Sequence, residues 1–252
     1  MNIKSKEEIE AMAESGRILA EVMEKILKEV ETGITLKELD KLTEDLIRKA
    51  GAKPAFLNYK PEGAKRPYGA SICASLNDVI VHGFPTKYKL KSGDVFKLDF
   101  GVLHKGFFTD AAITILIGEA SAIARKLVEA TKEALERAIR KCEPGNTLGD
   151  VGFEIENIAK RNGFKAVKGL TGHGIGRKLH EEPTIHNYGK KGEGMKLEPG
   201  MVLALEPMFT LGTDRIIQKK DESWATADGS LSAHFEHTVA ITEDGPRILT
   251  KL

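Results

Sequence analysis

The sequence predicts one α/β domain, spanning residues 1–252, in which antiparallel strands are flanked by two pairs of helices. Two helical stretches lie near the N-terminus and two near the middle, and strand patterns fill the segments between them. Several sequence features also recur, in nearly the same order, in the two halves of the chain. With 41% hydrophobic and 30% charged residues, the composition is that of a globular protein and excludes disordered and collagen-like classes.

Four segments carry apolar residues at helical spacing, and they cover residues 6–30, 36–50, 120–142 and 148–162. Thr35 precedes the second segment as a predicted N-cap. The first segment mixes charges with its apolar residues and lacks the continuous apolar core of a signal peptide. The longest stretch free of charged residues, 67–77, is too short for a membrane-spanning helix. We therefore expect a cytoplasmic protein without a membrane span.

Two runs, at residues 94–103 and 110–117, alternate apolar and polar residues as strands do. The alternation places Asp99 and Asp110 on the polar faces, so we expect Asp99 to point away from the core face. An even-length loop between the runs would set these two acids opposite or diagonal to each other, roughly 5–8 Å apart. A three-residue bulged loop would break this parity. A third run, at residues 235–242, alternates in the same way and has Glu236 on its polar side.

The two halves of the chain share an ordered set of matches. Residues 33–36 resemble residues 145–148, and residues 89–99 resemble residues 196–206, with Asp99 matched by Glu206. His82 and His180 are each followed by a proline three positions later. These matches indicate two related halves that each deliver a histidine and acids to a shared axis, and the alternative is coincidence among common residues.

The charge balance and the cysteine content exclude several partners. Lys and Arg number 38 against 37 Asp and Glu, so there is no basic surplus for binding nucleic acid or an anionic membrane. Two cysteines, Cys73 and Cys142, cannot build a disulfide framework and favour a reducing compartment. We expect Cys142 to be a plain buried thiol.

Acids and histidines gather in motifs that fit metal chemistry. Two carboxylates as close as Asp99 and Asp110 repel each other unless one is protonated or a cation lies between them, and the alternative is a pair of solvated strand acids. Glycines flank His173 in the run Thr171–Gly176, where they allow either close approach of a ligand or simple turn geometry. Glu206 follows an apolar run, where an unpaired carboxylate is costly to bury. An oxygen-rich site with one imidazole and no thiolate suits Mn²⁺, Co²⁺, Fe²⁺ or Zn²⁺.

Over essentially its whole length, and through these motifs, the sequence resembles the type I methionine aminopeptidases, the short form of a family with the pita-bread fold. The resemblance implies hydrolysis that removes the initiator methionine from nascent proteins when the second residue is small. It implies two divalent ions, Co²⁺, Mn²⁺, Fe²⁺ or Zn²⁺, with a hydroxide between them as the nucleophile. The implied metal ligands are Asp99, Asp110, His173, Glu206 and Glu236. The implied catalytic residues are Glu206 as the proton shuttle, and His82 and His180, which also contact the substrate.

The same resemblance suggests residues for the methionine side-chain pocket, although each of them could instead be plain core. They are Tyr68, Cys73, Leu179, Trp224 and Phe235. Three departures from the family concern the shape of this pocket. Residues 59–67 form a lengthened segment, Leu179 replaces a common aromatic residue, and His234 stands where glutamine is frequent.

The expected partners are methionyl peptides and nascent chains, with transient ribosome contact, and nothing demands more than a monomer. One alternative is an Xaa-Pro aminopeptidase or prolidase, which uses the same kind of ligand set but resembles longer chains with an added N-terminal domain. Another alternative is a non-catalytic binding module of the same fold. Such modules characteristically lose metal ligands, whereas all five are present here.

Overall fold

The computed structural model describes residues 2–60 and 65–251, so four residues of the lengthened segment 59–67 fall outside the description. Its helices are α1 (Lys6–Glu29), α2 (Leu36–Lys49), α3 (Ala122–Ile139) and α4 (Leu148–Asn162), which confirms the four predicted segments. Ser5, Thr35 and Thr147 begin α1, α2 and α4 with capping boxes, in which each side chain and a later acid satisfy backbone amides reciprocally. None of the helices in the described residues is long and apolar enough to cross a membrane.

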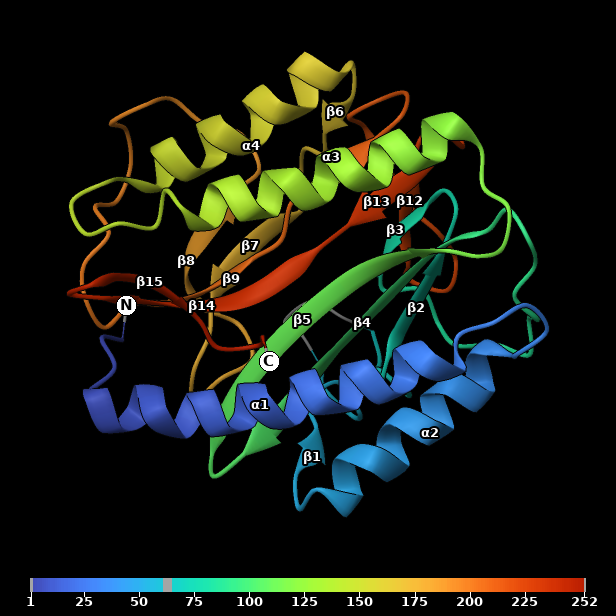
Figure 1. The fold of residues 1–252 in the computed structure, drawn as a ribbon, viewed down its shortest axis with the longest axis horizontal. Helices are drawn as coiled ribbons and strands as arrows, with labels where there is room; N and C mark the ends of the chain where they lie inside the picture. Colours follow the sequence, from blue (N-terminus) through green and yellow to red (C-terminus); the bar gives the residue numbers. More distant parts are fainter. Residues whose placement is uncertain (1, 61–64, 252) are drawn as a thin grey trace.

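A nine-stranded antiparallel sheet forms the centre of the molecule. Its order is β1-β4-β5-β14-β9-β7-β8, with β2 beside β4 and β15 beside β14. The strands are β1 (Lys53–Pro54), β2 (Cys73–Leu76), β4 (Val95–His104), β5 (Phe107–Leu116), β7 (Thr171–Gly174), β8 (Glu181–His186), β9 (Val202–Leu205), β14 (Glu236–Thr242) and β15 (Gly245–Ile248). In Figure 1 the long strands β4, β5 and β14 curve through the centre, with one helix pair along each side.

Two three-stranded sheets complete the fold. One contains β6 (Lys165–Ala166), β10 (Met208–Thr210) and β13 (Ser232–His234), and the other contains β3 (Val79–Val81), β11 (Ile216–Gln218) and β12 (Trp224–Thr226). Pairing in both is antiparallel.

The β4–β5 hairpin shows whether the loop between these strands has an even or an odd number of residues, which the sequence left open. His104 pairs with Phe107, and Lys105 and Gly106 form the loop with φ angles of 49° and 81°. Two successive positive φ angles are typical of a tight two-residue hairpin turn, for which glycine is favoured. The loop is therefore even, and Asp99 and Asp110 lie diagonally across the two strands, as one predicted arrangement required.

The repeat in the sequence is also a repeat in the structure. Thr35 bridges to Lys89 in the first half, and Thr147 bridges to Lys196 in the second. The amide of the glycine two residues before each threonine donates to Leu90 O at 2.8 Å or to Leu197 O at 2.9 Å. Because the same contacts recur around the matched residues, duplication explains the pattern better than coincidence does.

Each helix pair covers its own apolar cluster. Residues of α1 and α2 pack with β4, whereas residues of α3 and α4 pack with β9 and β14. Ile113 on β5 contacts both clusters and joins them. Cys142 is fully buried as a free thiol, as expected from the sequence.

The polar face of β4 corrects one expectation. Lys97 and Asp99 do lie on the face opposite Phe96, Leu98 and Phe100, but they are only 1% and 7% exposed. The amine of Lys97 donates to Asn77 O and to the carbonyl and hydroxyl oxygens of Ser232, so this face is covered by other segments. The alternative of solvated strand acids is therefore wrong for Asp99.

Candidate metal centre

Three carboxylates share one face of the central sheet because of its register. Ala112 on β5 pairs with Asp99 on one side and with Glu236 on the other. Asp110 lies two residues before Ala112 and so points to the same face. All three acids are buried, with exposed fractions of 3–7%. The hairpin and the strand β14, although far apart in sequence, therefore deliver their acids to one place.

The second half adds an imidazole and a fourth carboxylate. His173 on β7 pairs with Ala204 on β9, and Leu205 pairs with His237 on β14. Continuing that register by one residue sets Glu206 opposite Glu236. The Nε2 atom of His173 lies 3.7 Å from Oε1 of Glu206, so the two side chains meet. The structure thus brings together all five residues expected as metal ligands.

The donor atoms of this cluster fit a divalent cation. Asp110, His173 and Glu236 each offer a ligand atom, and these atoms lie within 4.8 Å of one another. Within the described residues, Asp99 Oδ1 and Glu236 Oε1 are buried without a hydrogen-bond partner. Buried oxygens without partners are costly, and carboxylates with one imidazole are a ligand set for Mn²⁺, Fe²⁺, Co²⁺ or Zn²⁺.

The electrostatics of the cluster point the same way. Burial, reinforced by neighbouring carboxylates, raises the pKa values of Asp99, Asp110, Glu206 and Glu236 well above their ordinary range. Burial lowers the pKa of His173 to about 3, with a smaller contribution from His180, so the ring is neutral and has a lone pair to offer. A cation would relieve the repulsion that these four acids impose on one another.

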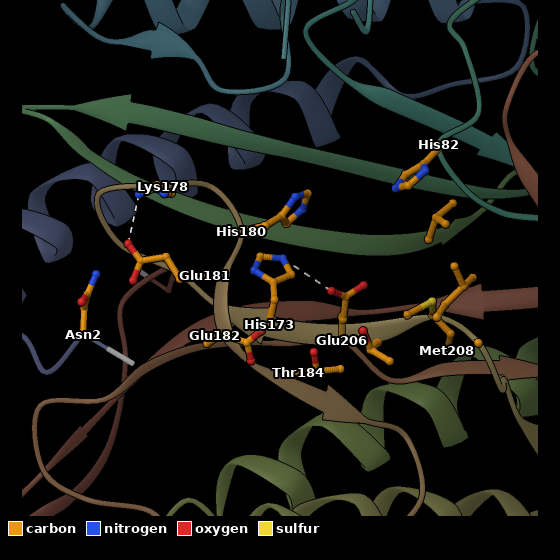
Figure 2. Close-up of a pocket in the computed structure, with 15 residues that line it drawn as sticks. Asn2, His82, His173, Lys178, His180, Glu181, Glu182, Thr184, Glu206 and Met208 are labelled. Atoms are coloured by element: carbon orange, nitrogen blue, oxygen red, sulfur yellow. Dashed lines mark hydrogen bonds and ion pairs between the residues drawn. The ribbon is translucent and has the colours of Figure 1, made fainter. Parts of the chain in front are cut away.

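A cavity of about 710 Å³ opens onto this cluster, and His82, His173, His180 and Glu206 line it. Figure 2 shows His173, His180 and Glu206 close together, with His82 farther along the cavity. The rings of His173 and His180 meet edge to face, with their centroids 4.4 Å apart. Desolvation by the surrounding protein lowers the pKa of His180 and, with a smaller contribution from His180, lowers the pKa of His82 to about 4.

The expected pocket residues are not among the residues that line this cavity. Cys73 on β2 pairs directly with Asp99, and the Tyr68 hydroxyl donates to the carbonyls of Ile72 and Gly83. Leu179 and Phe235 are buried next to His180 and Glu236 in the chain, and Trp224 on β12 pairs with Val81. Their role in side-chain selection stays a prediction.

Three residues near the centre were not predicted as site residues. The strand alternation could have indicated His234 and Lys97, whereas no local pattern indicated Tyr59. His234 alternates with Glu236 and is 2% exposed, with Nε2 3.6 Å from Glu206 Oε2. Burial, with Lys97 and His82 nearby, lowers the pKa of His234 to about 3. Lys97 shares a face with Asp99, as described above. Tyr59, whose hydroxyl lies 2.8 Å from Nδ1 of His180, comes from a loop 121 residues away and carried no local signal.

Gly172 and Gly174, on either side of His173, lie against the backbones of neighbouring segments, and Gly172 also lines the cavity. A Cβ at Gly172 would lie 2.4 Å from the carbonyl oxygen of Ala204, and one at Gly174 would lie 2.2 Å from that of Glu182. These residues are glycine because neighbouring backbones press against β7.

Gly172→Ala should therefore push β7 away from β9 and lower the free energy of unfolding by about 1–3 kcal/mol, the usual cost of overpacking. Gly69→Ala is the matched control, since its Cβ would meet only Phe84 at 3.6 Å. Urea unfolding of both variants measures the effect. Equal stability of the two variants would contradict the close-approach explanation.

The model of metallopeptidase family M24 matches residues 10–243 of the chain. The chain belongs to metallopeptidase family M24. Among its relatives in this family, the methionine aminopeptidase of Aquifex aeolicus is 45% identical over 259 aligned positions, which cover 100% of this chain and 99% of the relative. The crystal structure of the Thermotoga maritima methionine aminopeptidase superposes with a TM-score of 0.94 at 40% identity and covers 100% of both chains.

The comparisons also confirm the pita-bread fold of the M24 family. Prolidase from Pyrococcus furiosus superposes with a TM-score of 0.79 at 26% identity, and the match covers 99% of this chain but 65% of the prolidase. The prolidase therefore contains a substantial part that has no counterpart here. The methionine aminopeptidases of Aquifex aeolicus and Thermotoga maritima, by contrast, match over 99–100% of both chains.

Proposed function

We propose that this M24 metallopeptidase is a methionyl aminopeptidase that removes the N-terminal methionine from peptides and nascent proteins, with a preference for a small second residue. The observation that carries the proposal is the convergence of Asp99, Asp110, His173, Glu206 and Glu236 beneath a cavity lined by histidines. Full-length similarity to methionine aminopeptidases supports this substrate over the proline-specific alternative. We further propose that residues 1–252 act as one catalytic domain.

In this proposal two divalent ions occupy the centre. Asp99 and Asp110 would hold one ion, His173 and Glu206 would hold the other, and Asp110 and Glu236 would bridge both. Bound there, the ions would supply Lewis acidity, which polarises a substrate carbonyl and lowers the pKa of water. The choice among Co²⁺, Mn²⁺, Fe²⁺ and Zn²⁺ would follow cellular availability, because this ligand set accepts several metals.

Side chains of the protein would transfer protons and stabilise the negative charge that develops on the substrate oxygen. Glu206, ionised once the metal is bound, would accept a proton from the attacking water and pass it to the leaving amine. His180 is neutral, and when the Tyr59 hydroxyl donates to its Nδ1, the ring proton lies on Nε2. That N–H can then donate to the oxygen that becomes negative during hydrolysis. His82, also neutral, would contact the scissile amide.

Side-chain selection is assigned in this proposal to Tyr68, Cys73, Leu179, Trp224 and Phe235. Cys73 supports this role because its strand position sets it directly beside Asp99. Soft sulfur and aromatic faces suit a thioether such as methionine.

Release of free methionine from Met-Ala-Ser tests the proposal. The metal-free protein should be inactive, and added Mn²⁺ or Co²⁺ should start the reaction. A parallel series of peptides with proline in second place tests the nearest alternative. Preference for that series would overturn the substrate assignment, and no turnover of either series with any of the four metals would favour a non-catalytic module.

Tyr59→Phe should lower kcat about tenfold, because removing a residue that orients a site group typically costs 10–100-fold. The reason is that His180 would lose the hydroxyl that fixes its tautomer. Tyr188→Phe is the control, since that ring stacks on His186 instead. An unchanged kcat for Tyr59→Phe would contradict the orienting role.

We also propose that the protein works in the cytoplasm as a monomer and meets nascent chains through transient ribosome contact. The absence of a basic surplus supports contact that is brief rather than tight.

A further inference from the structure

A buried ion pair joins the N-terminal segment to the loop that carries His180. Lys4 Nζ lies 2.6 Å from Glu181 Oε2, and the two side chains are only 4% and 5% exposed. The Lys4 backbone amide also donates to Gly200 O at 2.8 Å, so residues before α1 are fixed at two points. A pair this deep differs from surface ion pairs, because removing one partner leaves an uncompensated buried charge.

Glu181 follows His180 in the chain, and its carboxylate binds both Lys4 and the backbone of the loop before His180. While Oε2 binds Lys4, Oε1 accepts the backbone amide of Lys178 at 3.0 Å. The stem of Lys4 also packs on this loop, since a Cβ at Gly176 would lie 2.4 Å from Lys4 Cε. The loop backbone around His180 is therefore held by a contact that comes from 177 residues away.

The same segment reaches the cavity. Asn2 lines it together with Glu181 and Glu182, and Figure 2 shows Asn2 and Glu181 on the side of His180 away from His82. His180 is thus secured from two directions. Tyr59 contacts its ring, and Lys4 acts on its backbone through Glu181.

We propose that Lys4 is a positioning residue for His180, acting through the buried ion pair with Glu181, and that Asn2 forms part of the wall of the substrate cavity. This inference rests on the proposed function for its kinetic test. Lys4 touches neither the metal centre nor the place of the reacting atoms. Substitution of Lys4 should therefore slow the hydrolysis step, in which a correctly placed His180 donates to the developing oxyanion.

The kinetic test uses Lys4→Met, which keeps the apolar stem and removes the charge, with Lys6→Met as the control at an exposed position in α1. Metal-loaded Lys4→Met should show kcat on Met-Ala-Ser lowered about tenfold, the scale typical of losing an orienting contact, with metal affinity by calorimetry unchanged. Glu181→Gln should behave alike. The double variant Lys4→Met/Glu181→Gln should be no worse than either single variant, because both act through one contact.

A single variant that buries an unpaired charge could fold poorly. The double variant removes both charges, so it should fold and can still be measured. Hydrogen exchange gives a readout that does not depend on activity. Backbone amides of residues 176–182 should exchange faster in the double variant than in the wild type, while those of α2 stay unchanged.

The outcomes are distinct. Lower melting temperature with unchanged kcat and unchanged exchange at residues 176–182 would mean a merely structural ion pair and would overturn the inference. If the wild-type protein releases no methionine with any metal, the proposed function fails. Hydrogen exchange would still decide whether Lys4 holds the loop, and unchanged exchange would overturn that too.

Discussion

Asp110→Asn should abolish methionine release and, at the same time, make the metal-free protein more stable at pH 7. Activity should fall by roughly 10³-fold or more, because metal-ion catalysis supplies several kcal/mol and each 1.4 kcal/mol is about tenfold in rate. Stability should rise because burial and Asp99 raise the pKa of Asp110 in the folded state. An acid with a raised folded pKa weakens the fold above its unfolded pKa, so the gain should vanish below about pH 4.

Thermal melting of the metal-free proteins and a methionine-release assay check both parts. A gain of about 1 kcal/mol would raise Tm by roughly 2–4 °C for a chain of this size. Asp45→Asn is the control, because Asp45 forms an exposed ion pair with Lys41 and should matter little to either measurement. A variant at Asp110 that keeps a tenth of the activity would contradict its place among the ligands.

Binding of Mn²⁺ should release protons, so metal affinity should rise with pH across the range in which the raised carboxyls titrate. The carboxyls of Asp99, Asp110, Glu206 and Glu236 have pKa values raised well above normal, so the metal-free centre holds protons that a cation must displace. His173, with a pKa of about 3, contributes none in this range. Each proton released should give roughly a tenfold gain in affinity per pH unit.

Calorimetry in buffers of different ionisation enthalpy counts these protons directly. The control is the Asp110→Asn protein, which should bind metal more weakly and release fewer protons. Metal binding that releases no protons at any pH above the ordinary pKa of a carboxyl would mean that the four carboxyls are already ionised without metal, contrary to the effect of their burial.

Local patterns were enough to predict much of the centre. Alternation in the β4 and β5 segments identified which residues share a face, and an even loop at Lys105 and Gly106 made Asp99 and Asp110 diagonal. The repeat also matched Asp99 with Glu206 before any fold was known. The predicted N-cap Thr35 also marked where the second helix begins. Apart from the repeat, each of these features depends on neighbours within a few residues.

Other features depend on contacts between distant segments and left no local trace. Period two shows that Lys97 and Asp99 share a face, but it cannot show that Asn77 and Ser232 cover that face. The contact of Tyr59 with His180 likewise appears only once the chain has folded. The close approach of Ala204 O to Gly172 also arises between strands, so the sequence around Gly172 does not show it.

The pairing of β5 with β14 joins the two halves of the protein at Ala112–Glu236 and Ala111–His237. Asp110 and Glu236 lie on opposite sides of this strand pairing, so an ion bound by both residues would crosslink the two halves. Removal of the ion by a chelator should therefore weaken the β5–β14 pairing first. Unfolding under mechanical force should likewise begin at the metal centre.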